Sequence, residues 1–175
     1  GEDLMFNVFD GNLFYWDKTL GLGNRATTFA SQTGASDAPT ITRRLMTSTT
    51  DRHVVCFGCN PINETEQDLL MVRWSDQENP FDWYPTATNT AGDLLVGTGS
   101  QIVTAVETRR EIIVLTDTSV HSLQFIGPPF IFGLTQISLG STIIGPNAAV
   151  AVNDAVFWMG NGRFYLYDGS LKPLA

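Results

Sequence analysis

The sequence predicts an all-β protein, built as a β-propeller-like array of antiparallel meander blades that forms part of a larger propeller. Three observations predict it. Short apolar runs alternate with a period of two, as strands do. Sixteen glycines and eight prolines are dispersed between these runs, which favours many short strands over long helices. A meander pattern also recurs about every 40 to 60 residues, a spacing typical of propeller blades.

The clearest meander covers residues 101–126. Residues 102–107 alternate between two faces, and residues 112–115 are an unbroken apolar run, as expected for a strand covered on both faces. Residues 116–119 supply turn chemistry, because short side chains with oxygen atoms bond the local backbone. Residues 120–125 alternate again. We therefore expect three strands joined by two tight turns.

The same pattern recurs elsewhere in the chain, although the residue identities match poorly. The three further strand pairs are residues 3–8 with 13–17, residues 53–57 with 69–76, and residues 155–159 with 163–169. Outer strands are expected at residues 26–30, 91–96, 134–137 and 148–152. Residues 31–42 are expected to connect two blades, and a short helix could precede Arg44.

Two segments between the strands have unusual compositions. Residues 74–85 are expected to form a long loop, held on the sheet by Trp74, Phe81 and Trp83 because large rings dominate core burial. Residues 126–133 contain two successive prolines, which cannot donate to a strand ladder, so a connection and not a central strand is expected. Two exposed rings in it, Phe130 and Phe132, would either contact a neighbouring subunit or cover the domain's own core.

The bulk composition limits the classes of function. A hydrophobic content of 43% with 16% charged residues is ordinary for a folded protein. The net charge of −8 argues against a surface that grips nucleic acid or anionic lipid. No apolar run approaches the ~20 residues that cross a bilayer, so no membrane insertion by this segment is expected. Residues 1–175 are expected to be a single, partial β-propeller domain within a longer chain.

No catalytic, cofactor-binding or metal-binding residues are predicted, and the chain is not expected to be an enzyme. Cys56 and Cys59 form a C-x-x-C, but zinc would need a second pair of ligands. A redox site would open a helix, whereas Asn60 and Pro61 follow directly. An ordinary pair of thiols at a strand end is therefore expected.

The remaining polar candidates are expected to be structural. His53 and His121 lie inside strand-like runs, and no nucleophile elbow accompanies Ser119 and Asp117 beside His121. Other partial matches are equally weak: the lone G-x-G at Gly21–Gly23, the glycosylation-like sequon at Asn63–Thr65, and the acidic residues Asp76, Glu78 and Asp82, which lack the pattern of a calcium loop.

Four runs together resemble tail proteins of short-tailed bacteriophages. They are WSDQENPFDWYPTATNTAGDLLVG, TRREIIVLTDTSVHSLQFIGPPFIFG, IIGPNAAVAV and VFWMGNGRFYLYDG. The family is similar to the nozzle, or tail-tube, component below the portal and adaptor. The resemblance spans nearly all of the chain, and its motifs are structural, so it transfers no site residues.

The resemblance implies a structural virion protein without cofactors, a β-propeller of which six copies surround the DNA-ejection channel. Its implied partners are further copies of itself and the adjacent tail adaptor and fibre proteins. DNA would pass through the channel without specific binding, and an acidic wall would repel phosphate. The implied location is the phage tail of the virion, assembled in the host cytoplasm.

One alternative function comes from a different class. A carbohydrate-binding or host-receptor-binding propeller domain would use exposed tryptophans as stacking platforms for sugar rings. The candidates are Trp16, Trp74, Trp83 and Trp158. A generic repeat scaffold for protein contacts is a third interpretation.

Overall fold

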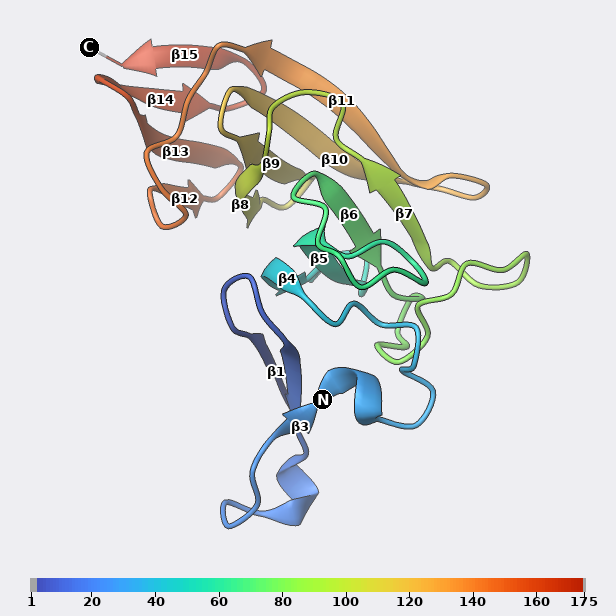
Figure 1. Cartoon of the computed structure of the whole chain (residues 1–175). Helices are drawn as coiled ribbons and strands as arrows, with labels where there is room; N and C mark the ends of the chain where they lie inside the picture. The colour runs from blue at the N-terminus through green and yellow to red at the C-terminus, as the bar shows by residue number, and fades with distance from the viewer. Residues whose placement is uncertain (1–2, 175) are drawn as a thin grey trace. The chain divides into compact units, whose positions relative to one another are not determined.

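The computed structural model describes residues 3–174. The chain divides into two compact units, Gly1–Leu95 and Val96–Ala175, and each contains two antiparallel sheets (Figure 1). The all-β class is confirmed, because the four sheets hold three or four strands each. Within the described range, the helical elements are two three-residue 3₁₀ turns, Lys18–Leu20 and Phe29–Ser31.

Both sheets of the first unit are meanders, in which each strand pairs with the next along the chain. The first sheet has three strands: β1 (Leu4–Asn7), β2 (Leu13–Trp16) and β3 (Thr27–Thr28). The second sheet has four: β4 (Thr42–Thr47), β5 (Val54–Cys59), β6 (Met71–Trp74) and β7 (Gly92–Leu95).

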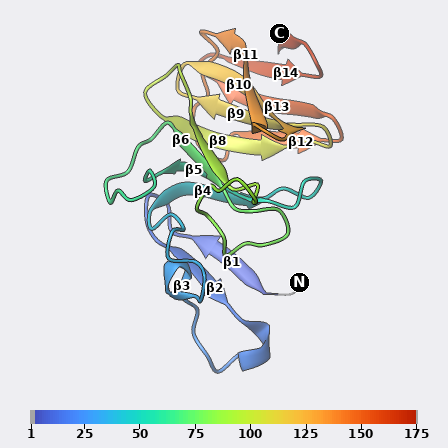
Figure 2. The same ribbon diagram turned by 90° about the vertical axis from the view of Figure 1, so that its right-hand side faces the viewer.

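The second unit consists of two four-stranded meanders, which Figure 2 shows side by side. The first contains β8 (Ile102–Glu107), β9 (Ile112–Thr116), β10 (Ser119–Gly127) and β11 (Ile131–Leu139). The second contains β12 (Ala149–Val152), β13 (Ala155–Gly160), β14 (Arg163–Tyr167) and β15 (Leu171–Leu174). The expected strands at residues 102–107, 112–115 and 120–125 are confirmed as β8, β9 and β10.

The hydrophobic patterns of the strands account for part of their burial. Every residue of β5 and of β9 is buried, and for β9 the unbroken apolar run at residues 112–115 predicted this. In β13 buried residues alternate with more exposed ones, because successive side chains of a strand point to opposite faces. The unbroken apolar run therefore indicated cover on both faces correctly for β9, whereas β13 is equally apolar and has one more exposed face.

Two expectations about connections were wrong in part. The segment before Arg44 contains no helix, and residues 42–47 instead form strand β4, which pairs with β5. Residues 126–133 are not wholly a connection, because β10 continues to Gly127 and β11 begins at Ile131. Pro128 and Pro129 lie in the turn between them, where no ladder bond is needed, and β11 is the edge strand of its sheet.

The core of the first unit is rich in aromatic rings. Phe29 and Trp83 are buried together with Leu13 and Cys56, and Phe81 packs against them. The Phe29 and Phe81 rings stack with their centroids 5.6 Å apart, and Trp83 meets Phe29 edge-on. The long loop expected at residues 74–85 covers residues 75–91, and Phe81 and Trp83 hold it on the sheets as predicted. Trp74 belongs to β6 instead, and its Nε1 donates to the Thr90 carbonyl at the end of the loop.

The core of the second unit lies between its two sheets. Ile113, Leu115 and Val120 of the first sheet pack against the second sheet, where Trp158 and Tyr165 are buried. The Trp158 and Tyr165 rings stack with a centroid distance of 5.2 Å. Each sheet of this unit therefore covers one face of the other.

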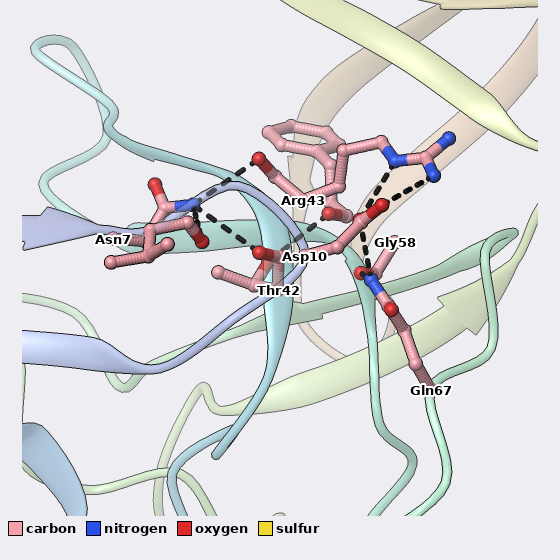
Figure 3. A network of polar contacts seen from close by, with 8 residues as sticks. Asn7, Asp10, Thr42, Arg43, Gly58 and Gln67 are labelled. Atoms are coloured by element: carbon pink, nitrogen blue, oxygen red, sulfur yellow. Dashed lines mark hydrogen bonds and ion pairs between the residues drawn. The ribbon is translucent and has the colours of Figure 1, made fainter.

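A polar network, the Asp10 network, joins the two sheets of the first unit (Figure 3). The Arg43 side chain donates two hydrogen bonds to the Asp10 carboxylate, from Nε at 2.9 Å and from a terminal nitrogen at 2.8 Å. Gln67 Nε2 donates to the same carboxylate and to the Gly58 carbonyl. Asn7 Nδ2 donates to backbone carbonyls of β4. The turn after β1 is thereby fixed to β4 and to the end of β5.

Replacing Arg43 by Met is expected to lower the free energy of unfolding by about 1.5–3 kcal/mol, the usual value of a hydrogen bond to a charged group. The Arg43 side chain is only 9% exposed, so solvent does not replace its bonds to Asp10. Chemical denaturation at pH 7 measures the change. The matched control is Arg52→Met, because the Arg52–Glu78 pair is more than half exposed and should cost less than about 1 kcal/mol.

Acid is expected to abolish the contribution of the Asp10 carboxylate to the free energy of unfolding. The hydrogen bond from Arg43 lowers the pKa of Asp10 below its ordinary 3.8. A carboxyl group with a lowered pKa stabilises the fold above its unfolded pKa, and this stabilisation is lost as pH falls through the folded pKa. The stability difference between the wild type and Asp10→Asn should therefore shrink below pH 3.8; a difference that stays constant would contradict this role.

Candidate assembly surfaces

The sheet formed by β12–β15 carries large apolar side chains on the face opposite the core of its unit. In the strand register Val150 lies beside Phe157, and Met159 lies beside Phe164, which in turn lies beside Leu174. Residues directly opposite one another in antiparallel strands share a face. We call this surface the β12–β15 outer face, and it consists of Val150, Val152, Phe157, Met159, Phe164 and Leu174, each between 36% and 56% exposed.

The β12–β15 outer face is hollowed at two places. A hollow of about 590 Å³ is lined by Met159, Phe164 and Leu174, with Arg163 at its border. A second hollow of about 250 Å³ is lined by Val150 and Phe157, and again by Met159 and Phe164. The β12–β15 outer face is therefore apolar and uneven.

Both faces of this sheet are mainly apolar, although Lys172 lies on the outer face beside Leu166. On its inner face Val156, Trp158 and Tyr165 are covered by the sheet β8–β11. Sheets with one solvated face alternate between apolar and polar residues, and sheets covered on both faces do not. The sequence of β12–β15 is that of a sheet with both faces covered, and contiguous apolar patches of this kind mark interaction sites.

The first sheet has a similar surface. Leu4 lies beside Trp16 and Phe6 beside Phe14 in the register of β1 and β2, and the Phe6 and Phe14 rings stack at 5.4 Å. Leu4 is 54% exposed and Phe6 is 39% exposed. The opposite face of this hairpin, with Leu13, packs on the core of the first unit. We call Leu4, Phe6, Phe14 and Trp16 the β1–β2 outer face.

The two rings expected after the double proline have different environments. Phe132 is buried and meets Phe125 edge-on at 5.7 Å, so its ring is covered by other residues of this chain. Phe130 lies in the turn between β10 and β11 and is 72% exposed. Only Phe130 is therefore positioned to contact another molecule.

Ser119 and His121 lie together, as a nucleophile and base would, but they are inaccessible. Ser119 Oγ is 2.9 Å from His121 Nε2, and both side chains are buried. The Asp117 carboxylate bonds instead to the backbone nitrogen and hydroxyl of Ser100. Thr98 Oγ1 is a further neighbour of His121 Nε2, at 3.0 Å. A substrate cannot reach the serine, because its side chain is buried. The hydroxyl groups and the imidazole therefore form a buried hydrogen-bonded cluster.

The two cysteines are free thiols buried within β5. Burial raises the pKa of Cys59 to about 12 and the pKa of Cys56 well above its ordinary value. Reactive cysteines need a lowered pKa and access to solvent, so these thiols serve as small core residues. Within residues 3–174 no group of three or more His, Cys, Asp and Glu side chains is arranged to hold a metal ion.

The tryptophans are not the exposed platforms that the carbohydrate interpretation requires. Trp74, Trp83 and Trp158 are between 1% and 3% exposed. Trp83 and Trp158 lie in the cores of their units, and Trp74 Nε1 donates to the Thr90 carbonyl. Trp16 is partly covered, and its Nε1 donates to the Asn24 carbonyl. The expectation of four exposed rings was therefore wrong for three of them, because their neighbours in space bury them.

The other weak motifs lie in loops. Gly21–Gly23 belongs to the exposed loop between β2 and β3, and Asn63–Thr65 belongs to the exposed loop between β5 and β6. The three acids after β6 have separate partners, since Asp76 accepts from Thr90, Glu78 pairs with Arg52, and Asp82 accepts from Asn89. No helix in the described part of the chain is long and apolar enough to cross a membrane.

Sequence reasoning did not identify the two apolar outer faces. The signal was present in β14, where Phe164 and Leu166 alternate with Tyr165 and Tyr167, so that both faces of the strand are apolar. That pattern predicts cover on both faces but does not identify which face has a partner within the unit. The strand register and the core contacts decide this.

No protein-family model matches this chain, and no curated protein matches it in sequence.

Proposed function

We propose that this chain is a structural part of a bacteriophage tail nozzle, or tail tube. In this proposal its four sheets are blades of a larger β-propeller, and six copies surround the channel through which DNA is ejected, below the portal and adaptor. The protein is a virion component of the phage tail, assembled in the host cytoplasm, and it performs no catalysis. Its neighbours are further copies of itself and the tail adaptor and fibre proteins.

The β12–β15 outer face is the observation that carries the proposal. An antiparallel meander with two apolar faces is stable when a sheet covers each face. The inner face of β12–β15 is covered by another four-stranded meander, and a further sheet of the same kind is the matching cover for the outer face. The β1–β2 outer face supports the same arrangement at the first sheet. Repeated sheets that cover one another are the construction of a propeller.

The composition supports the proposed location beside DNA. The net charge of −8 disfavours tight binding of phosphate, so DNA would pass without being held. The short sheet edges of propeller blades resist unwanted pairing with other chains, which suits a rigid wall. The resemblance to tail proteins is the reason for proposing a phage tail as the particle. The apolar β12–β15 outer face is the reason for proposing that the chain assembles with further sheets.

Replacing both Phe157 and Phe164 by Asp is expected to prevent the next sheet from covering the β12–β15 outer face, and with it to abolish assembly into closed rings of copies. Burial of each phenylalanine side chain stabilises the packed interface by about 1.5–3 kcal/mol. Burial of two carboxylates in the same apolar interface would cost more free energy than the two side chains supplied. Electron microscopy of the wild-type protein should show closed rings of six copies, and the variant should show none. Circular dichroism of the variant should remain that of a β protein, because both side chains are partly exposed before assembly.

The control is Thr135→Asp, an exposed threonine on β11, which should leave the rings intact. Rings that survive the double substitution would remove the β12–β15 outer face as an assembly surface. A wild-type protein that is a monomer with catalytic activity would refute the proposal as a whole.

A further inference from the structure

A pocket of about 500 Å³ opens in the first unit. Asn7, in the Asp10 network, bonds to the beginning of β4, whereas the pocket is lined by Thr47 at the end of β4 and by Asp3 and Met5. The two sheets are thus bound together at one end, and the pocket lies at the other. Its volume falls in the range of about 300–1,000 Å³ typical of small-molecule sites.

The floor of the pocket is apolar and held in place. Met5, Tyr15, Val54 and Phe81 line it. Phe81 stacks on the buried Phe29 ring and meets Tyr15 edge-on at 5.5 Å. Because these contacts fix both rings before any ligand arrives, binding would require little ordering of the floor.

The rim consists of side chains in donor–acceptor pairs. The Tyr15 hydroxyl donates to Asp3 Oδ2 at 2.7 Å, and Arg52 forms an ion pair with Glu78. The hydrogen bond from Tyr15 lowers the pKa of Asp3, and the same bond raises the pKa of Tyr15 to about 12. The rim of the pocket therefore presents the carboxyl groups of Asp3 and Glu78, the phenol of Tyr15 and the guanidinium of Arg52.

The charges of the rim exclude some classes of ligand. The carboxylates of Asp3 and Glu78 outnumber the guanidinium of Arg52, which Glu78 already neutralises. An anion would be repelled. A wholly apolar ligand would remove solvent from the rim's charged groups and offer them no new hydrogen bonds. The matching ligand is neutral, with an apolar face and several hydroxyl groups.

We propose that this pocket binds a neutral saccharide. The C–H face of a sugar ring lies on Met5, Val54 and Phe81, and neighbouring hydroxyl groups bond to Asp3 and to the Arg52–Glu78 pair. Carboxylates accept from hydroxyl groups and guanidinium donates to them, so each rim pair complements two adjacent hydroxyls. This proposal does not depend on assembly of the nozzle, and it uses none of the tryptophans.

The test is a printed glycan array that contains neutral and acidic glycans, probed with the 175-residue chain. Binding to at least one neutral glycan is expected. Replacing Thr47, an exposed pocket residue on the edge strand β4, by Trp should fill the mouth and weaken that binding at least about tenfold. The matched control is Thr135→Trp on the edge strand β11, which should bind as the wild type does.

A second variant tests the rim chemistry without adding bulk. Arg52→Gln with Glu78→Gln removes both charges of an exposed ion pair, so the fold should persist, and affinity for the same neutral glycan should fall about tenfold or more. Arg109→Gln, at an exposed site in the second unit, is its control. An array without any bound neutral glycan overturns the proposal, as does binding to acidic glycans alone, or binding that both pocket variants retain.

Discussion

Replacing Trp83 by Ala should lower the free energy of unfolding of the first unit by about 3–5 kcal/mol, the usual cost of removing a large ring from a packed core. Trp83 is 1% exposed, packs on Phe29, and lies with its ring centroid 6.0 Å from the Arg73 guanidinium. Its Nε1 donates to the Pro80 carbonyl at 2.7 Å. Equilibrium denaturation in guanidinium chloride, followed by circular dichroism, measures the loss.

Replacing Trp83 and Trp158 separately by Phe gives a matched comparison of the two buried tryptophans. Trp158 is equally buried in the second unit, but within the described residues its Nε1 has no hydrogen-bond partner. Trp83→Phe should cost more than Trp158→Phe, because only Trp83 loses a hydrogen bond. A Trp83→Ala variant that keeps wild-type stability but no longer binds a glycan would contradict the core role and restore the stacking role.

Mild acid should destabilise the protein before its carboxyl groups titrate. Burial lowers the pKa of His53 and of His121 below the ordinary 6.5; at His53 the nearby Asp51 and Asp76 partly oppose this effect. Below pH 6.5 each histidine binds a proton in the unfolded state but stays neutral in the fold until pH falls through its lowered pKa. The unfolded state then binds more protons, so stability falls as pH falls.

The free energy of unfolding is expected to fall by up to about 1.4 kcal/mol per pH unit for each histidine as pH decreases. Denaturation at several pH values between 5 and 6.5 measures it, with carboxyl groups still ionised. His121→Gln should flatten the profile, because glutamine does not titrate. A wild-type stability that does not change over this range would show that the two imidazoles are not buried in neutral form.

The strands with simple patterns could be predicted from the sequence. The alternation at residues 102–107 and the apolar run at residues 112–115 predicted β8 and β9 correctly, because the period of apolar residues reports which faces are covered. The turn between β1 and β2 contains Asp10, whose φ is positive, and Gly11, a dipeptide that is typical of such turns.

Strand β4 could not be predicted because its polar residues have distant partners. Arg43 and Arg44 make residues 42–47 look like a solvated connection. The charge of Arg43 is satisfied by Asp10, which is 33 residues away in sequence. Strand β15 was missed for a related reason, since Pro173 argues against a strand unless that strand lies at a sheet edge, as β15 does.

By itself, the sequence determined the all-β class, the order of most strands and the absence of an obvious catalytic motif, because these depend on residues close together along the chain. Only the tertiary structure decided which aromatic rings are buried and which are available to a partner. Trp83 and Phe164 look alike as large apolar residues, yet one is enclosed by Phe29 and Arg73, and the other lies on an uncovered sheet face. Exposure depends on neighbours brought together by folding, and no local pattern encodes them.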